Sequence, residues 1–339
     1  MESFILQMPF IPLLFWEKWQ PPFGIAVVHS CFNVAATLVL LPFSNGLVKL
    51  ACLTLPTHED VKEMSETDKT LSLLDPRFLD TPAYAVEQSR QVASVMADKS
   101  RKAMDLAMEL LQGYDVAKAE QVAQMETDVD RFEDELGTYL VKLSSRQLSG
   151  KDSETLNTIL HCIGDFERIS DHARNVKEAA QEMYDKKLDF SDKAQEELKV
   201  FERAVHDILD ITMNSFIKGD LNLARQVEPM EEVIDGLSLD VKQRHVRRLR
   251  KGKCTIELGF ILSDVITNFE RVSDHCSNIA VCLVQVNEDE FDTHAYLDEL
   301  RQEDNLDFQG KVMACREKYQ LPPTKQDRVM EKNAKLLAE

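Results

Sequence analysis

The chain has 339 residues and is strongly acidic, with 59 Asp and Glu against 40 Lys and Arg and a formal net charge of −19. This balance argues against a nucleic-acid-binding protein, because phosphate backbones are bound by clustered positive surfaces. The seven cysteines form no Cys-x-x-Cys pair, which predicts reduced thiols and excludes a thiolate zinc site. Few glycines and few alternating apolar runs favour helices throughout.

An apolar stretch near the N-terminus predicts a single transmembrane helix at about residues 24–41. It carries no charged side chain and is closed by Pro42, and its length is just sufficient to cross a bilayer. A buried core helix is the alternative that length leaves open. His29 and Asn33 lie four residues apart and form a polar pair on one face, where a membrane helix would meet another helix or an aqueous path.

The rest of the chain is expected to be all-α and to form two tandem three-helix bundles. Residues 54–80 are polar and are interpreted as a linker, and Thr81 followed by Pro82 is a typical helix start. Short connections predict antiparallel neighbours within each bundle. The expected domains are residues 81–188 and 189–286, with second helices at 118–147 and 222–251, third helices at 152–187 and 254–286, and an acidic loop, C-terminal helices and a charged tail at 287–339.

An internal duplication underlies these two bundles. The segment Phe166–Val176 returns in the second half as Phe269–Ile279, with most positions identical. A shorter segment upstream, Met125–Asp130, returns as Met230–Asp235. Two copies of one structural unit are therefore expected.

Each copy carries acidic residues four positions apart, which a helix places on one face. Such like-charged pairs cost a helix roughly 0.2–0.5 kcal/mol each, so the repetition predicts a compensating cation. Oxygen donors of this kind suit magnesium, manganese, calcium or iron. The candidate metal ligands are Glu126, Asp130, Glu167, Asp171 and Asn175 in the first half and Glu231, Asp235, Glu270, Asp274 and Asn278 in the second.

Two other interpretations of the acidic faces remain open. In one, the chain is a metal-free helical adaptor whose acidic faces bind a basic partner protein. In the other, the carboxylates hold metal for an oxidase, but such sites use Glu-x-x-His on facing helices, and that motif is missing beside these residues. We therefore expect a protein that is not an enzyme.

Histidines and a basic run complete the set of candidate residues. His172 and His275 directly follow the motif Asp, so they lie about 100° around the helix from it and are expected to bond to a neighbouring helix. The basic run at residues 244–253 contains Gly252, a typical helix stop. It fits a solvated helix end stabilised by the helix dipole, or a contact with anionic lipid headgroups or an acidic partner.

The duplicated Glu-Arg-x-Ser-Asp-His-x-x-Asn motif, each copy preceded by Met-Glu-x-x-[Val/Ile]-Asp, resembles the PhoU-like domain. That resemblance covers roughly residues 75–285 and implies tandem three-helix bundles whose Glu/Asp motifs bind metal, iron clusters in some members. The usual form of the motif has Gly where Ser170 and Ser273 stand here.

Residues 25–50 resemble the last membrane helix of Na+/phosphate cotransporters, after which many bacterial members carry a PhoU-like domain. The resemblance implies that residues 1–53 are a remnant of the membrane transport domain, although its transport motifs are missing. It also implies a regulatory module that modulates phosphate uptake, located at the cell membrane with the PhoU-like domain in the cytoplasm. The implied partners are the membrane and the remaining transport domain, with a possible homo-oligomer.

Overall fold

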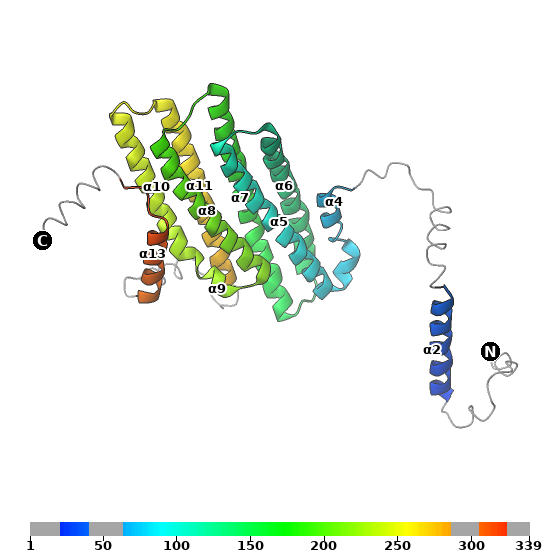
Figure 1. The fold of residues 1–339 in the computed structure, drawn as a ribbon. Coiled ribbons are helices and arrows are strands. Elements are labelled where there is room, and N and C mark those ends of the chain that lie inside the picture. Colours follow the sequence, from blue (N-terminus) through cyan, green and yellow to red (C-terminus); the bar gives the residue numbers. More distant parts are fainter. Residues whose placement is uncertain (1–20, 41–63, 286–304, 324–339) are drawn as a thin grey trace. The chain divides into compact units, whose positions relative to one another are not determined.

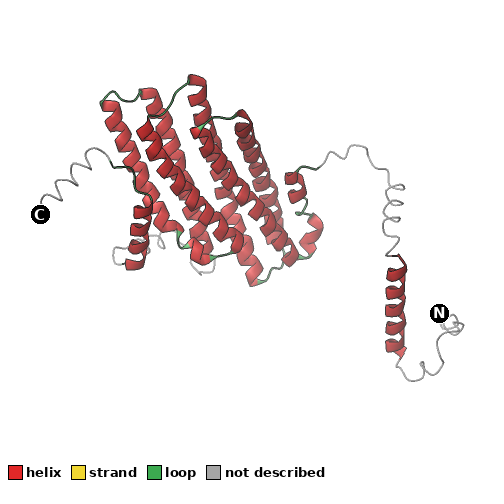
Figure 2. Ribbon diagram, in the orientation of Figure 1, coloured by secondary structure: helices red, strands yellow, loops and turns green. Residues whose placement is uncertain are grey.

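The computed structural model describes residues 21–40, 64–285 and 305–323, and all regular structure in these ranges is helical (Figure 2). The all-α prediction is therefore confirmed for them. The chain divides into two compact units, Met1–Met64 and Ser65–Glu339.

The first unit contributes helix α2, Pro21–Leu40. This helix includes His29 and Asn33, both exposed in their unit. Among the described helices, none is long and apolar enough to cross a membrane, so the predicted transmembrane helix at 24–41 is not supported. Most of the predicted transport remnant at 1–53 lies outside the described residues.

The second unit contains the two predicted three-helix bundles (Figure 1). The first bundle consists of α5 (Pro82–Gln112), α6 (Val116–Ser144) and α7 (Gly150–Lys186). The second consists of α8 (Asp192–Lys218), α10 (Val227–Arg250) and α11 (Ile256–Gln285). The predicted up-down-up order is confirmed in each.

One predicted helix is broken in two. The expected helix at 222–251 begins with a short α9 (Leu221–Ala224) and continues as α10 only after Gln226. Pro229 explains the break, because a proline has no backbone N–H to donate and its ring clashes with the carbonyl four residues earlier.

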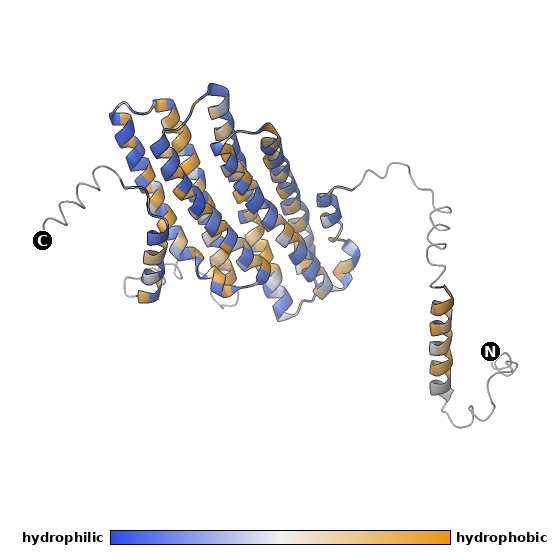
Figure 3. Cartoon of the chain, in the orientation of Figure 1, coloured by the Kyte–Doolittle hydropathy of each residue, from blue (hydrophilic) through white to orange (hydrophobic). Residues whose placement is uncertain are grey.

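The two bundles share one core. Phe132, Phe166, Phe201 and Phe269 are fully buried in a single hydrophobic cluster that spans both halves. Phe166 packs edge-to-face on Phe216, with ring centroids 4.9 Å apart. Helices α7 and α11 pack against each other at the junction, and the colouring by hydropathy in Figure 3 shows apolar and polar positions alternating around the helices of the unit. The halves therefore form one body.

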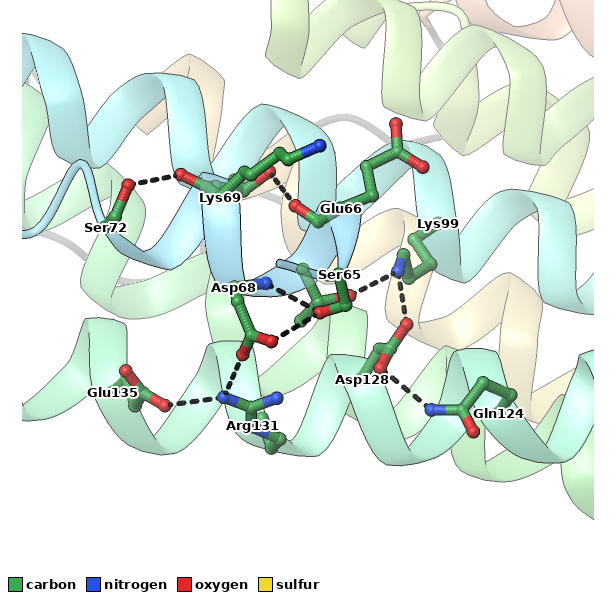
Figure 4. A network of polar contacts seen from close by, with 12 residues as sticks. Ser65, Glu66, Asp68, Lys69, Ser72, Lys99, Gln124, Asp128, Arg131 and Glu135 are labelled. Carbon is green, nitrogen blue, oxygen red and sulfur yellow. Dashed lines mark hydrogen bonds and ion pairs between the residues drawn. The ribbon is translucent and has the colours of Figure 1, made fainter. Parts of the chain in front are cut away.

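Part of the predicted linker belongs to this body. Residues 65–80 form helix α4 (Glu66–Leu71) and the 3-10 helix η3 (Pro76–Asp80), with Leu71 and Leu79 buried. Lys99 of α5 donates from Nζ to Thr67 Oγ1 of α4 at 3.1 Å and to Asp128 of α6 at 2.5 Å. Figure 4 shows the contact with Asp128 and the bond that Arg131 of α6 donates to Asp68 of α4. The apolar positions between the polar ones explain why this segment packs.

A C-terminal helix covers the second bundle. Helix α13 (Leu306–Lys318) packs on α10, and Phe308, Val312 and Tyr319 are buried there. The hydroxyl of Tyr319 donates to Asp207 at 2.6 Å. One predicted C-terminal helix is thus confirmed, while the acidic loop and the charged tail lie largely outside the described residues.

Candidate metal centres

In the first half, α6 and α7 bring three carboxylates together. Glu126 and Asp130 lie one turn apart on α6, Asp171 lies on α7, and one oxygen of each is within 4.8 Å of the others. A cation with oxygen ligands at about 2.0–2.6 Å fits among atoms so spaced.

The second half repeats this arrangement. Glu231 and Asp235 on α10 and Asp274 on α11 meet the same 4.8 Å criterion. In both clusters the Glu is only 6% exposed, while the two Asp are more open. Each cluster is therefore anchored in the bundle and faces solvent on one side, which leaves a path for an ion.

Glu167 of α7 lies in the electrostatic field of the first cluster. Burial, followed by the negative charge of Asp171, raises the pKa of Glu167 to about 7, and Asp130 and Glu133 add to the effect. Burial and Asp171 also raise the pKa of Asp130. Carboxylates whose pKa values are raised by burial and by one another favour a bound cation, because the ion would stabilise their ionised form.

Glu270, the counterpart of Glu167, has a different environment. Lys242 donates to its carboxylate at 2.9 Å and Ser238 at 2.6 Å. Burial alone would raise the pKa of Glu270, but these hydrogen bonds outweigh it and hold the pKa below its ordinary value. The repeat places Gly137 and Glu133 where Lys242 and Ser238 stand. The second centre therefore has an internal ammonium group that the first lacks.

Arginines compensate part of the first cluster. Arg174 forms an ion pair with Glu126, and Arg168 lies 3.4 Å from Asp171. In the second half Ser277 occupies the place of Arg174 and donates instead to Glu228. The two centres thus share a carboxylate triad and differ in the cations around it.

The histidines and asparagines of each motif form hydrogen bonds with residues of the other half. His172 bonds to Asn268 on α11 at 2.8 Å, and His275 bonds to Asp165 on α7 at the same distance. This confirms the prediction of bonds to a neighbouring helix. The two imidazole rings face each other with centroids 5.5 Å apart.

The side-chain amides of the motif asparagines donate to the same two residues of the other half. Asn175 donates to Asn268 at 3.2 Å, and Asn278 donates to Asp165 at 3.3 Å. Their amide nitrogens are directed at the opposite half, and a ligand role for their oxygens stays a prediction.

Sequence reasoning missed Arg174, Lys242 and the Asp165/Asn268 pair. Comparing the two repeats position by position would have revealed Lys242, because it replaces a glycine of the first copy. The arginine contact depends on how α6 and α7 pack, which no spacing along one helix reveals.

Ser170 and Ser273 are fully buried within the helices that carry these motifs. Among the described residues, their hydroxyls have no hydrogen-bond partner. A buried hydroxyl without a partner is a cost to stability that glycine would avoid.

Comparison with known proteins gives a consistent picture. Residues 93–180 and 199–283 match the family model of the PhoU domain, one match in each half. A curated relative from Thermotoga maritima, the phosphate-specific transport system accessory protein PhoU homolog 1, is 23% identical over 201 residues, which is 57% of this chain and 86% of that protein.

Two solved structures have the same fold. The crystal structure of PhoU from Pseudomonas aeruginosa has a TM-score of 0.55 at 21% identity and covers 59% of this chain and 95% of that one. The phosphate transport system regulatory protein PhoU from Streptococcus pneumoniae also has a TM-score of 0.55, at 17% identity, and covers 62% of this chain and 99% of that one.

Proposed function

The chain belongs to the PhoU domain family, and from this premise we propose that it is a metal-binding regulatory protein of phosphate transport. The names of its relatives describe accessory and regulatory proteins of phosphate transport, and they agree with the prediction that the chain is not an enzyme.

The observation that carries the metal proposal is the pair of matching carboxylate triads, each contributed by two helices. Oxygen-only donors favour a hard cation such as magnesium, manganese, calcium or iron. Bound to Asp130 and Asp171, the ion would hold α6 against α7; bound to Asp235 and Asp274, it would hold α10 against α11. The charge of the ion would offset the repulsion that raises the pKa of Glu167.

The narrower expectations remain proposals. Attachment to a Na+/phosphate cotransporter rests on the sequence resemblance of residues 25–50, and a cytoplasmic position and a homo-oligomer rest on the family.

Metal content of the purified full-length chain, measured by inductively coupled plasma mass spectrometry, tests the proposal. One variant carries Asp130→Asn and Asp171→Asn, and a second carries Asp235→Asn and Asp274→Asn. The matched control carries Glu120→Gln and Asp240→Asn, which change exposed carboxylates on α6 and α10. We expect each paired variant to lose the metal of its own half and the control to lose none.

A folded chain without metal, or with equal metal in all variants, would contradict the metal proposal. The acidic faces would then be interpreted as a surface for a basic partner protein, the alternative that the sequence left open.

A further inference from the structure

The basic run of α10 divides into two groups with different surroundings. Arg244 and Arg248 both reach Glu197, a buried residue of α8, and the Arg248 contact measures 2.6 Å. Arg244 also donates to the carbonyl of Pro322 at 2.6 Å. These two arginines are structural, because a buried carboxylate requires a partner.

The other four basic residues of the run point outward: Arg247, Arg250, Lys251 and Lys253 are all exposed. Within the described ranges they form no ion pair. The chain has a net charge of −19, so these four positive side chains within seven positions form a local basic surface on an otherwise acidic protein. The helix dipole favours such residues at the end of α10, but it does not require four of them or extend to Lys253.

Large apolar side chains are exposed beside these charges. Ile256 and Phe260 are 67% and 69% exposed, and they lie one turn apart on the same face of α11. Val246, next to Arg247 on α10, is also exposed. Exposed Phe and Ile within a basic cluster are typical of surfaces that enter the headgroup region of a bilayer.

The corner that carries these residues is well defined. Gly252 adopts φ +62°, a left-handed conformation that glycine accommodates without strain. Next to it, a Cβ on Gly259 would come within 2.8 Å of His245 Nε2, so α10 and α11 approach closely. The one acidic residue of residues 244–260, Glu257, is held by Lys186 of α7 at 2.7 Å.

From these observations we infer that residues 246–260, the α10–α11 corner, dock on an anionic lipid bilayer. The four basic side chains would contact the headgroups, and Ile256 and Phe260 would enter the interfacial layer. The neighbouring end of α7, the α7–α8 connection and the start of α8 carry Asp185, Asp189 and Asp192, respectively. An anionic surface repels these carboxylates, so only the corner makes contact. Figure 1 shows both connections at the same end of the bundles. The inference is independent of the metal centres.

Tryptophan fluorescence tests this contact at one position. The full-length chain has two tryptophans, so a Trp16→Phe, Trp19→Phe background allows Phe260→Trp to report on residue 260 alone. The protein is mixed with phosphatidylcholine vesicles that contain a brominated lipid, with or without phosphatidylglycerol. A second reporter, Val141→Trp, replaces a residue that is 64% exposed near the other end of the bundle.

Two charge variants are compared in the Phe260→Trp chain. The first changes the four outward basic residues of the corner to Gln. The matched control changes four exposed basic residues of the opposite end, also without an ion pair among the described residues, to Gln: Lys142, Lys151, Lys218 and Arg225. Equal thermal midpoints of the variants will show that folding is unchanged.

We expect the reporter at 260 to be quenched on anionic vesicles and not on neutral ones, and the reporter at 141 to be quenched on neither. Each basic residue near an anionic surface contributes about fivefold to binding. The corner variant should therefore need on the order of several hundredfold more lipid for half-maximal quenching, and the opposite-end variant the same amount as its parent.

An unquenched reporter at 260, or quenching that is equal on neutral vesicles, would overturn the inference. Equal loss in the two charge variants would also overturn it, because the contact would then depend on total charge and not on the corner. Binding to an acidic protein would leave the reporter unquenched on vesicles and would count against lipid as the partner.

Discussion

Glu167 and Glu270 occupy the same position of the repeat, and their neutralisation is expected to change stability in opposite directions. Burial and Asp171 raise the pKa of Glu167 from 4.5 to about 7. Because the folded-state pKa lies above the unfolded value, the stability linked to this group is present below the unfolded pKa and is lost as the pH rises through about 7. Without metal, Glu167→Gln should therefore stabilise the protein at pH 8 and have less effect at pH 5.

The magnitude follows from the size of the shift. At about 1.4 kcal/mol per pKa unit the shift corresponds to roughly 3 kcal/mol, but the Glu167 side chain is 20% exposed and solvent screens part of the repulsion. We expect about 1–2 kcal/mol, which raises the thermal midpoint by about 2–6 °C in a body of this size. Glu270→Gln removes the bond from Lys242 and should leave stability unchanged or lower it by up to about 1 kcal/mol.

Differential scanning fluorimetry of both variants at pH 5 and pH 8, after treatment with EDTA, measures these shifts. A lower midpoint for Glu167→Gln at pH 8, or shifts of the same sign in both variants, would refute the electrostatic account of the two centres. If manganese is then added, the gain in midpoint should be smaller for Glu167→Gln than for the parent chain, because the repulsion that a cation relieves has already been removed.

Two further substitutions follow from individual contacts. Lys242→Gly removes the ammonium group beside Glu270 and should tighten manganese binding in the second half by about tenfold or more in calorimetric titration. The reason is that a nearby positive charge repels a cation by roughly 1–4 kcal/mol, and unchanged affinity would mean that Glu270 takes no part in the site. Lys99→Met removes the bonds to Thr67 and Asp128 and leaves the half-buried Asp128 carboxylate without its ion pair, with a bond from Gln124 remaining. The substitution should cost about 1–3 kcal/mol. Hydrogen exchange should accelerate across residues 66–71, whereas Lys142→Met, at an exposed position of α6, should leave it unchanged.

The arrangement of helices was largely predictable from the sequence, because helix ends are encoded locally. Thr81 precedes α5, which begins at Pro82 as the sequence predicted. The carboxylate pairs on one face were predictable for the same reason, since i and i+4 positions coincide on any helix. The duplication predicted two centres, and the structure brings one carboxylate triad together in each half, without Glu167 and Glu270.

The transmembrane helix predicted at residues 24–41 is not supported, because no described helix is long and apolar enough to cross a membrane. The extent of the linker was not predicted correctly. Residues 65–80 are polar on average, yet Leu71 and Leu79 are buried against the first bundle. The average composition of a segment does not show which of its few apolar side chains pack against the rest of the protein.

The sequence by itself determined the helical repeat and the candidate cation ligands, because both depend on spacing along one helix. Only the tertiary structure decided the charge around each centre, where Arg174 reaches Glu126 and Lys242 reaches Glu270 from another helix. It also decided that the motif histidines join the two halves. Such contacts depend on the angle and register at which helices pack, and these are set by the whole core.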